Sequence, residues 1–139
     1  MTRQTEGRRA DAGMMAVEMV LLAPVMVAFL LLVVAFGRFV AVRGEVEAAT
    51  RDAVRAASLE RSSGAAADAA RRTASASLAG RWQCGEPELG GAFGAGETIT
   101  VRLECSVPLS GLGLLGMPGS ISVHAQSAAP LDLYRRTDG

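Results

Sequence analysis

Lysine is absent from the 139-residue sequence, so all 14 basic side chains are arginine, and they are balanced by 14 acidic ones. The arginines are scattered along the chain, and the formal net charge is zero. A surface that binds nucleic acid needs a local concentration of positive charge. We therefore expect no nucleic acid among the partners.

Aromatic residues are also scarce, at 4% of the chain, although half of all residues are hydrophobic. The apolar content is mostly Ala, Val and Leu, which predicts a small core without large aromatic anchors. We find no pattern in the sequence that indicates a nucleophile with a base or a pair of catalytic carboxylates. The glycines of residues 90–96 do not form a phosphate-binding loop, because no Lys-Ser or Lys-Thr follows them. We expect no enzymatic activity, no cofactor and no small-molecule substrate.

Cysteine occurs only twice, as Cys84 and Cys105, and histidine once, as His124. These three side chains cannot complete a tetrahedral structural zinc site within one chain, so we expect no metal. An even pair of cysteines in an exported domain favours one disulfide, Cys84 to Cys105. Two buried free thiols are the alternative if this half of the chain is cytoplasmic.

The longest hydrophobic run covers residues 14–36 and contains one charged residue, Glu18. As a helix it is roughly 34 Å long, enough to cross a bilayer. A cleavable secretory signal has a shorter apolar core, so we predict a retained transmembrane helix. Arg3, Arg8 and Arg9 precede the run, which favours a cytoplasmic N-terminus. We therefore expect a single-pass protein of the cell membrane whose C-terminal region is extracytoplasmic.

A carboxylate within such a run costs a few kcal/mol at the bilayer centre, so Glu18 calls for an explanation. One is that Glu18 lies close to the interface, near the positive end of the helix dipole. The other starts from its spacing to Gly13 and Met14, which resembles the type IV prepilin pattern of Gly, cleavage, and Glu at the fifth mature position. Cleavage after Gly13 gives Met14 a free amine, whose charge Glu18 can offset in its own subunit or a neighbour.

Further residues resemble a particular pilin-related family. Pro24 follows Glu18 by six residues, Phe36-Gly37-Arg38 ends the apolar run, and residues 48–57 are rich in Ala and Arg. Together, residues 13 to 60 resemble TadE-like minor pseudopilins of the tight-adherence (Flp) pilus system. Met19 and Ala35 replace an aromatic and an acidic residue of the family pattern, and neither takes part in cleavage.

The resemblance implies a non-enzymatic membrane protein that prepilin peptidase cleaves and that acts with other pilin-like subunits and the pilus assembly machinery. The expected organisation is a cytoplasmic leader (1–13), a transmembrane helix (14–36), an exported helical region (37–79) and a small disulfide-bonded β-rich region (80–139). This is a pilin-like α+β fold.

In the exported helical region, Val42, Val46, Ala49, Ala53 and Ala57 recur every three or four residues. This stripe could pack against neighbouring subunits or against the chain's own sheet. Gly64 is expected to interrupt the helix, and a second helix is expected over residues 65–79, ended by Gly80.

Two segments alternate between apolar and polar residues, over 98–107 and 120–126, and predict a pair of antiparallel strands. Ile121, Val123 and Ala125 are expected to point inward and His124 to lie in solvent. Residues 82–97 are glycine-rich and predict a loop held by Cys84. The segment 108–119 is too apolar for an ordinary loop, so it is expected to cover the core, or else to contact a partner or the membrane surface.

Two other functions fit less of the sequence. One is a single-pass anchor with an outer binding or structural domain and no pilin processing, for which Gly13 and Glu18 are coincidental. The other is a secreted soluble protein, which requires cleavage beyond about residue 35. The N-terminus of the mature protein distinguishes all three.

Overall fold

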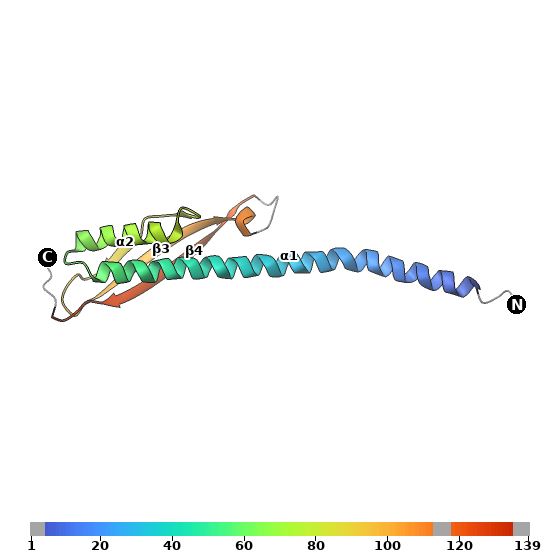
Figure 1. Cartoon of the computed structure of the whole chain (residues 1–139), viewed down its shortest axis with the longest axis horizontal. Coiled ribbons are helices and arrows are strands. Elements are labelled where there is room, and N and C mark those ends of the chain that lie inside the picture. The colour runs from blue at the N-terminus through green and yellow to red at the C-terminus, as the bar shows by residue number, and fades with distance from the viewer. Residues whose placement is uncertain (1–4, 113–117, 135–139) are drawn as a thin grey trace.

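The structure is a computed structural model that describes the backbone of residues 5–112 and 118–134, and the side chains of residues 19–112 and 118–134. One very long helix, α1 (Thr5–Ser58), extends far beyond a small domain built against its C-terminal part (Figure 1). That domain contains α2 (Ser63–Leu78), β1 (Gln83–Cys84), β2 (Glu88–Gly91), β3 (Thr98–Pro108), the 3-10 helix η1 (Leu109–Leu112) and β4 (Ser120–Pro130). The predicted α+β class is confirmed.

Helix α1 is continuous because its residues are mostly good helix formers, even though Pro24 lies inside it. A proline removes one backbone hydrogen bond and favours bending. Figure 1 shows α1 as a gently curved rod, without a break between its apolar and polar parts. The segment predicted to span a membrane therefore continues directly into the helix that carries the domain.

The break between the two helices lies at residues 59–62, slightly before the predicted position at Gly64. Ser62 caps α2 by accepting a hydrogen bond from the Ala65 N–H at 3.3 Å. Gly64 falls in the first helical turn, where backbone N–H groups need no helical partner, so glycine does not end the helix there. At the other end Ala79, with φ 48°, is already left-handed before Gly80.

The sheet is antiparallel and centres on β3, with β4 along one edge and the shorter β1 and β2 along the other. The predicted pairing of the two alternating segments is confirmed, with Cys105 opposite Val123 and Leu103 opposite Ala125. The expected inward side chains of β3 are all buried: Ile99, Val101, Leu103, Cys105 and Val107.

The expectation of a plain loop over residues 82–97 is wrong in part, because β1 and β2 lie within it. Strand β2 contains two glycines and no β-branched residue, so nothing in its composition indicates a strand. It pairs with β3 because its backbone can approach closely: Gly91 has φ +93°, and a Cβ there would run into the Thr98 carbonyl oxygen. The local sequence of β2 therefore does not predict a strand, because β2 forms only by pairing with β3.

The core lies between the helices and one face of the sheet, where α1 contacts α2, β3 and β4. The stripe whose packing partner was left open faces this core: Val42, Val46, Ala49, Ala53 and Ala57 are all buried. Thr50 is buried with them, and its hydroxyl donates to the Val46 carbonyl at 2.7 Å. The small residues thus let α1 pack against the chain's own helix and sheet.

Candidate processing site and the membrane-proximal surface

The predicted cleavage site lies in the N-terminal part of α1. The helix begins at Thr5 and passes through Gly13, Met14 and Glu18. The side chains of these three residues lie outside the described part of the structure, so their roles in cleavage and charge neutralisation stay predictions.

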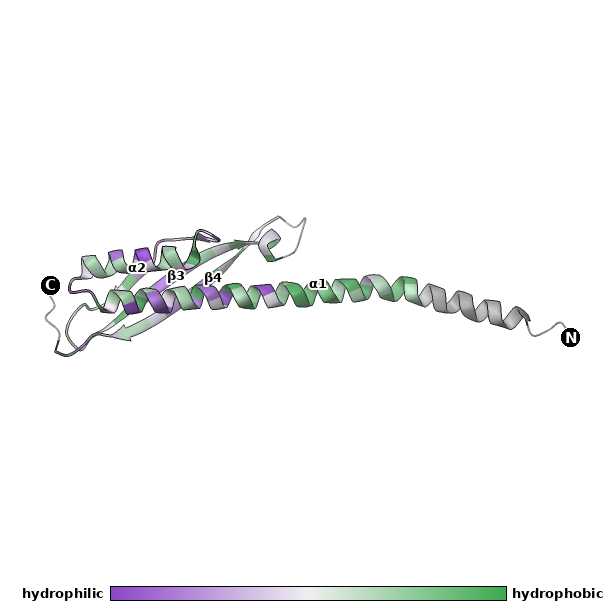
Figure 2. Ribbon diagram, in the orientation of Figure 1, coloured by the Kyte–Doolittle hydropathy of each residue, from purple (hydrophilic) through white to green (hydrophobic). Residues whose placement is uncertain are grey.

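The side chains of the apolar part of α1 are described from Met19 onward, and most of them are exposed to solvent. Among the described residues, α1 is the one helix long and apolar enough to cross a membrane, and its most apolar window is not buried within the molecule. In Figure 2 the ribbon of the same stretch is coloured mostly green, the colour of hydrophobic residues. From Leu21 to Phe36 the large side chains remain between 46% and 67% exposed. A surface of this extent needs an apolar environment to cover it.

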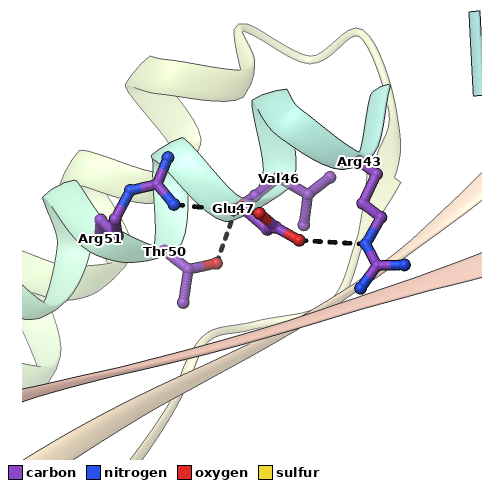
Figure 3. A network of polar contacts seen from close by, with 5 residues as sticks. All are labelled: Arg43, Val46, Glu47, Thr50 and Arg51. Carbon is purple, nitrogen blue, oxygen red and sulfur yellow. Dashed lines mark hydrogen bonds and ion pairs between the residues drawn. The ribbon is translucent and has the colours of Figure 1, made fainter. Parts of the chain in front are cut away.

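The helix surface becomes charged at the point where the domain begins. Glu47 accepts from Arg43 Nε at 3.0 Å and lies 3.9 Å from Arg51, one turn away on either side (Figure 3). These side chains are exposed, so each pair contributes little to stability. They lie on the exposed side of α1, away from the side on which Val46 and Thr50 are buried.

Glu45 connects α1 to the segment that leads into the sheet. One of its carboxylate oxygens accepts the indole N–H of Trp82 at 3.2 Å, and the other lies 3.4 Å from the Arg81 guanidinium. Sequence analysis missed this contact, because the partners are 36 and 37 residues apart and neither belongs to a motif.

The predicted disulfide is present between Cys84 and Cys105, which lie directly opposite each other on β1 and β3. Cys84 also lines a hollow, together with Arg71, Leu78 and Trp82. Arg71 Nε lies 3.5 Å from Glu86 at the rim of this hollow. None of these groups forms a nucleophile and base pair, and no cluster of His, Cys, Asp and Glu suited to a metal occurs within the described residues.

His124 lies on the solvent face of β4, as predicted. Its Nδ1 atom is 3.7 Å from a carboxylate oxygen of Glu104, its cross-strand neighbour, and both side chains are more than half exposed. The arrangement has no cleft and no third group. It is an exposed cross-strand pair, and such pairs contribute little to stability.

The apolar segment after β3 is described only in part. Leu112 in η1 is buried against the core, and Leu109 is half-buried, which confirms for Leu112 the expectation that this segment covers the core. Leu114, Leu115 and Met117 lie outside the described residues. Ile121, expected to point inward, is 37% exposed because it lies beyond the end of the domain's core, next to Phe36, Phe39 and Leu112.

Comparison with known proteins finds a match to a protein family. Residues 13–55 match the family model described as TadE-like protein, which is well under half of the chain. No curated protein and no solved structure matches this chain. The match confirms the resemblance that the sequence motifs predicted, and it associates the chain with the tight-adherence pilus system.

Proposed function

We propose that this chain, TadE-like over residues 13–55, is a minor pseudopilin: prepilin peptidase cleaves it after Gly13, and the mature protein acts in assembly of a tight-adherence type pilus or secretion apparatus. The proposal assigns it no catalytic role. Its partners are the membrane, prepilin peptidase, other pilin-like subunits and the assembly machinery.

The observation that carries the proposal is where the family match begins. It starts at Gly13, the residue after which the prepilin pattern puts cleavage, and it runs through the apolar segment into the polar part of α1. A coincidental Gly and Glu in an unrelated membrane anchor have no reason to fall at the boundary of a family match.

The charge balance at the new N-terminus supports the same function. Cleavage leaves Met14 with a positively charged amine at the start of an apolar helix, and Glu18 follows one turn later. Each charge alone is costly in hydrocarbon, whereas pairing within or between subunits offsets much of that cost. A neighbour's amine near Glu18 would let subunits enter an assembly without burying an unpaired charge.

The disulfide and the exposed apolar segment support an exported domain on a membrane anchor. Cys84 and Cys105 are joined, and disulfides persist in oxidising compartments outside the cytoplasm. With the N-terminus in the cytoplasm, residues 14–36 cross the membrane and the domain lies on the far side. The alternative, an unprocessed single-pass anchor with an outer binding domain, accounts for the anchor but not for the start of the match.

The assembly role is tested by substitutions at Glu18 in the organism that encodes the chain. Glu18→Ala removes the charge and is expected to leave cleavage largely intact while reducing the number of pili. Glu18→Asp is the control, because it keeps the carboxylate and should retain most pili. Normal piliation with the Ala variant, at matched protein levels, would remove the neutralisation role.

A further inference from the structure

An apolar groove lies where the membrane-spanning part of α1 meets the domain. Its lining is almost wholly hydrophobic and comes from two parts of the chain. Leu32, Ala35, Phe36 and Phe39 belong to α1, and Leu112 and Ile121 belong to the two sides of the β3–β4 connection. The domain's own core does not fill it, since Phe36 is 62% exposed and Ile121 37% exposed.

The 3-10 helix η1 is held against α1 at this position. Figure 1 shows η1 beside α1 at the end of the domain that faces the N-terminus of the chain. Leu112 is buried at 3% exposure, and the Leu109 N–H donates to the Gly119 carbonyl at 3.0 Å, which joins the two sides of the connection. The groove is therefore a built feature of the folded domain.

The groove lies at the position along α1 where the helix is expected to leave the bilayer. A hydrocarbon core of about 30 Å takes about 20 helical residues. A span that begins at residue 14 therefore leaves the hydrocarbon between about residues 33 and 36. Leu32 then lies among acyl chains, and Phe39 lies one turn above the boundary.

The charge pattern around the groove fits a lipid surface. No charged residue occurs in the sequence from 107 to 123, although charged residues are frequent elsewhere in the domain. Arg38 is exposed on α1 at the same level, where its guanidinium can reach phosphate groups while its stem stays apolar. The groove is thus lined by apolar residues, and an exposed arginine lies at the same level of α1.

We infer that the groove is occupied by lipid acyl chains of the leaflet on the domain's side, so that Leu112 and Ile121 provide a second membrane contact besides α1. The inference rests on the membrane anchorage in the proposed function. It fixes how the domain stands on the membrane: the end of the domain that holds Leu112 and Ile121 rests in the interface, and the end with the α1–α2 turn points away.

Lipid is the occupant that the groove's continuity favours. The groove opens without a polar boundary onto the exposed apolar surface of α1, from Phe36 down to Leu22, which the bilayer itself would cover. A helix from a neighbouring subunit would bury the groove only once an assembly had formed. The isolated subunit waiting in the membrane would still expose it.

Tryptophan quenching by brominated lipid tests this inference on the full chain in nanodiscs. Trp82 is first replaced by Phe, which removes the native emission and also the hydrogen bond to Glu45, so far-UV circular dichroism first establishes that this background keeps the wild-type fold. Single tryptophans are then placed by Ile121→Trp in the groove, Leu30→Trp in the apolar helix and Leu59→Trp at the far end of the domain. Emission is compared in bilayers with and without bromine on the acyl chains.

We expect the Leu30→Trp and Ile121→Trp variants to lose emission in brominated bilayers, and the Leu59→Trp variant to keep it. Quenching at position 30 without quenching at 121 would overturn the inference and leave the anchor intact, whether water or a neighbouring chain occupies the groove. Absence of quenching at position 30 would overturn the anchorage and the inference together. Phe39→Trp, on the opposite wall, is the second reporter if Ile121→Trp does not fold, and the same outcomes apply to it.

Discussion

The indole N–H of Trp82 donates to the Glu45 carboxylate at 3.2 Å, across 37 residues of sequence. This hydrogen bond joins the rod-like helix α1 to the chain just before β1, and Arg81 lies on the other oxygen of the same carboxylate. The domain is thus attached to its helix by a charged hydrogen bond as well as by the apolar core.

Glu45→Ala is expected to lower the free energy of unfolding by about 1–2 kcal/mol, because it removes a charge-assisted hydrogen bond that is partly shielded from solvent. Glu47→Ala is the matched control on the same helix. Its arginine partners are exposed, so we expect a loss of about 0.5 kcal/mol. Urea unfolding of the full chain in detergent, followed by far-UV circular dichroism, measures both. Equal losses would mean that the Trp82 contact has no special weight.

Loss of the Cys84–Cys105 disulfide is expected to destabilise the domain by about 3 kcal/mol. The reason is that the intact disulfide restricts the unfolded chain by joining residues 21 positions apart, and this restriction is lost with the bond. The unfolding midpoint of the wild type should fall when a reductant is added. The double variant Cys84→Ser/Cys105→Ser should start from the lower midpoint and be insensitive to the reductant. A wild-type midpoint unchanged by complete reduction would contradict this prediction.

Ala70 and Ala76 lie on opposite faces of α2, the first 1% exposed and the second open to solvent. Ala70→Leu is expected to cost about 1–3 kcal/mol, because the added carbons have no space in the contact between the helices and the sheet. Ala76→Leu should change stability by less than about 0.5 kcal/mol, since Leu is nearly as good a helix former. Thermal unfolding compares the two variants, and similar midpoints would mean that α2 does not pack as described.

The alternating residues of β3 and β4 predicted their pairing, because a half-buried strand repeats every two residues whatever lies around it. The stripe on α1 likewise predicted a packing face, although not its partner, since an alanine stripe suits a neighbouring helix and a sheet equally. The structure decides this point: the face packs within the chain, as the burial of Val46 and Ala53 shows.

The parts that sequence could not predict depend on contacts between distant segments. Strand β2 is glycine-rich and forms because Gly91 permits close approach to Thr98. The Glu45 to Trp82 hydrogen bond and the groove between Phe39 and Ile121 need the fold before their residues meet. The roles of Gly13, Met14 and Glu18 are the opposite case, because they are predicted from a sequence motif alone. The side chains of these residues lie outside the described part of the structure.

The N-terminus of the mature protein tests the central claim most directly. The protein is purified from membranes of cells with an active prepilin peptidase, and its N-terminal peptide is identified by mass spectrometry, for the wild type and for Gly13→Ala. The account predicts a wild-type chain that starts at Met14 and a variant that retains residues 1–13. A wild-type chain that starts at Met1 or Thr2 would contradict it and leave an unprocessed membrane anchor.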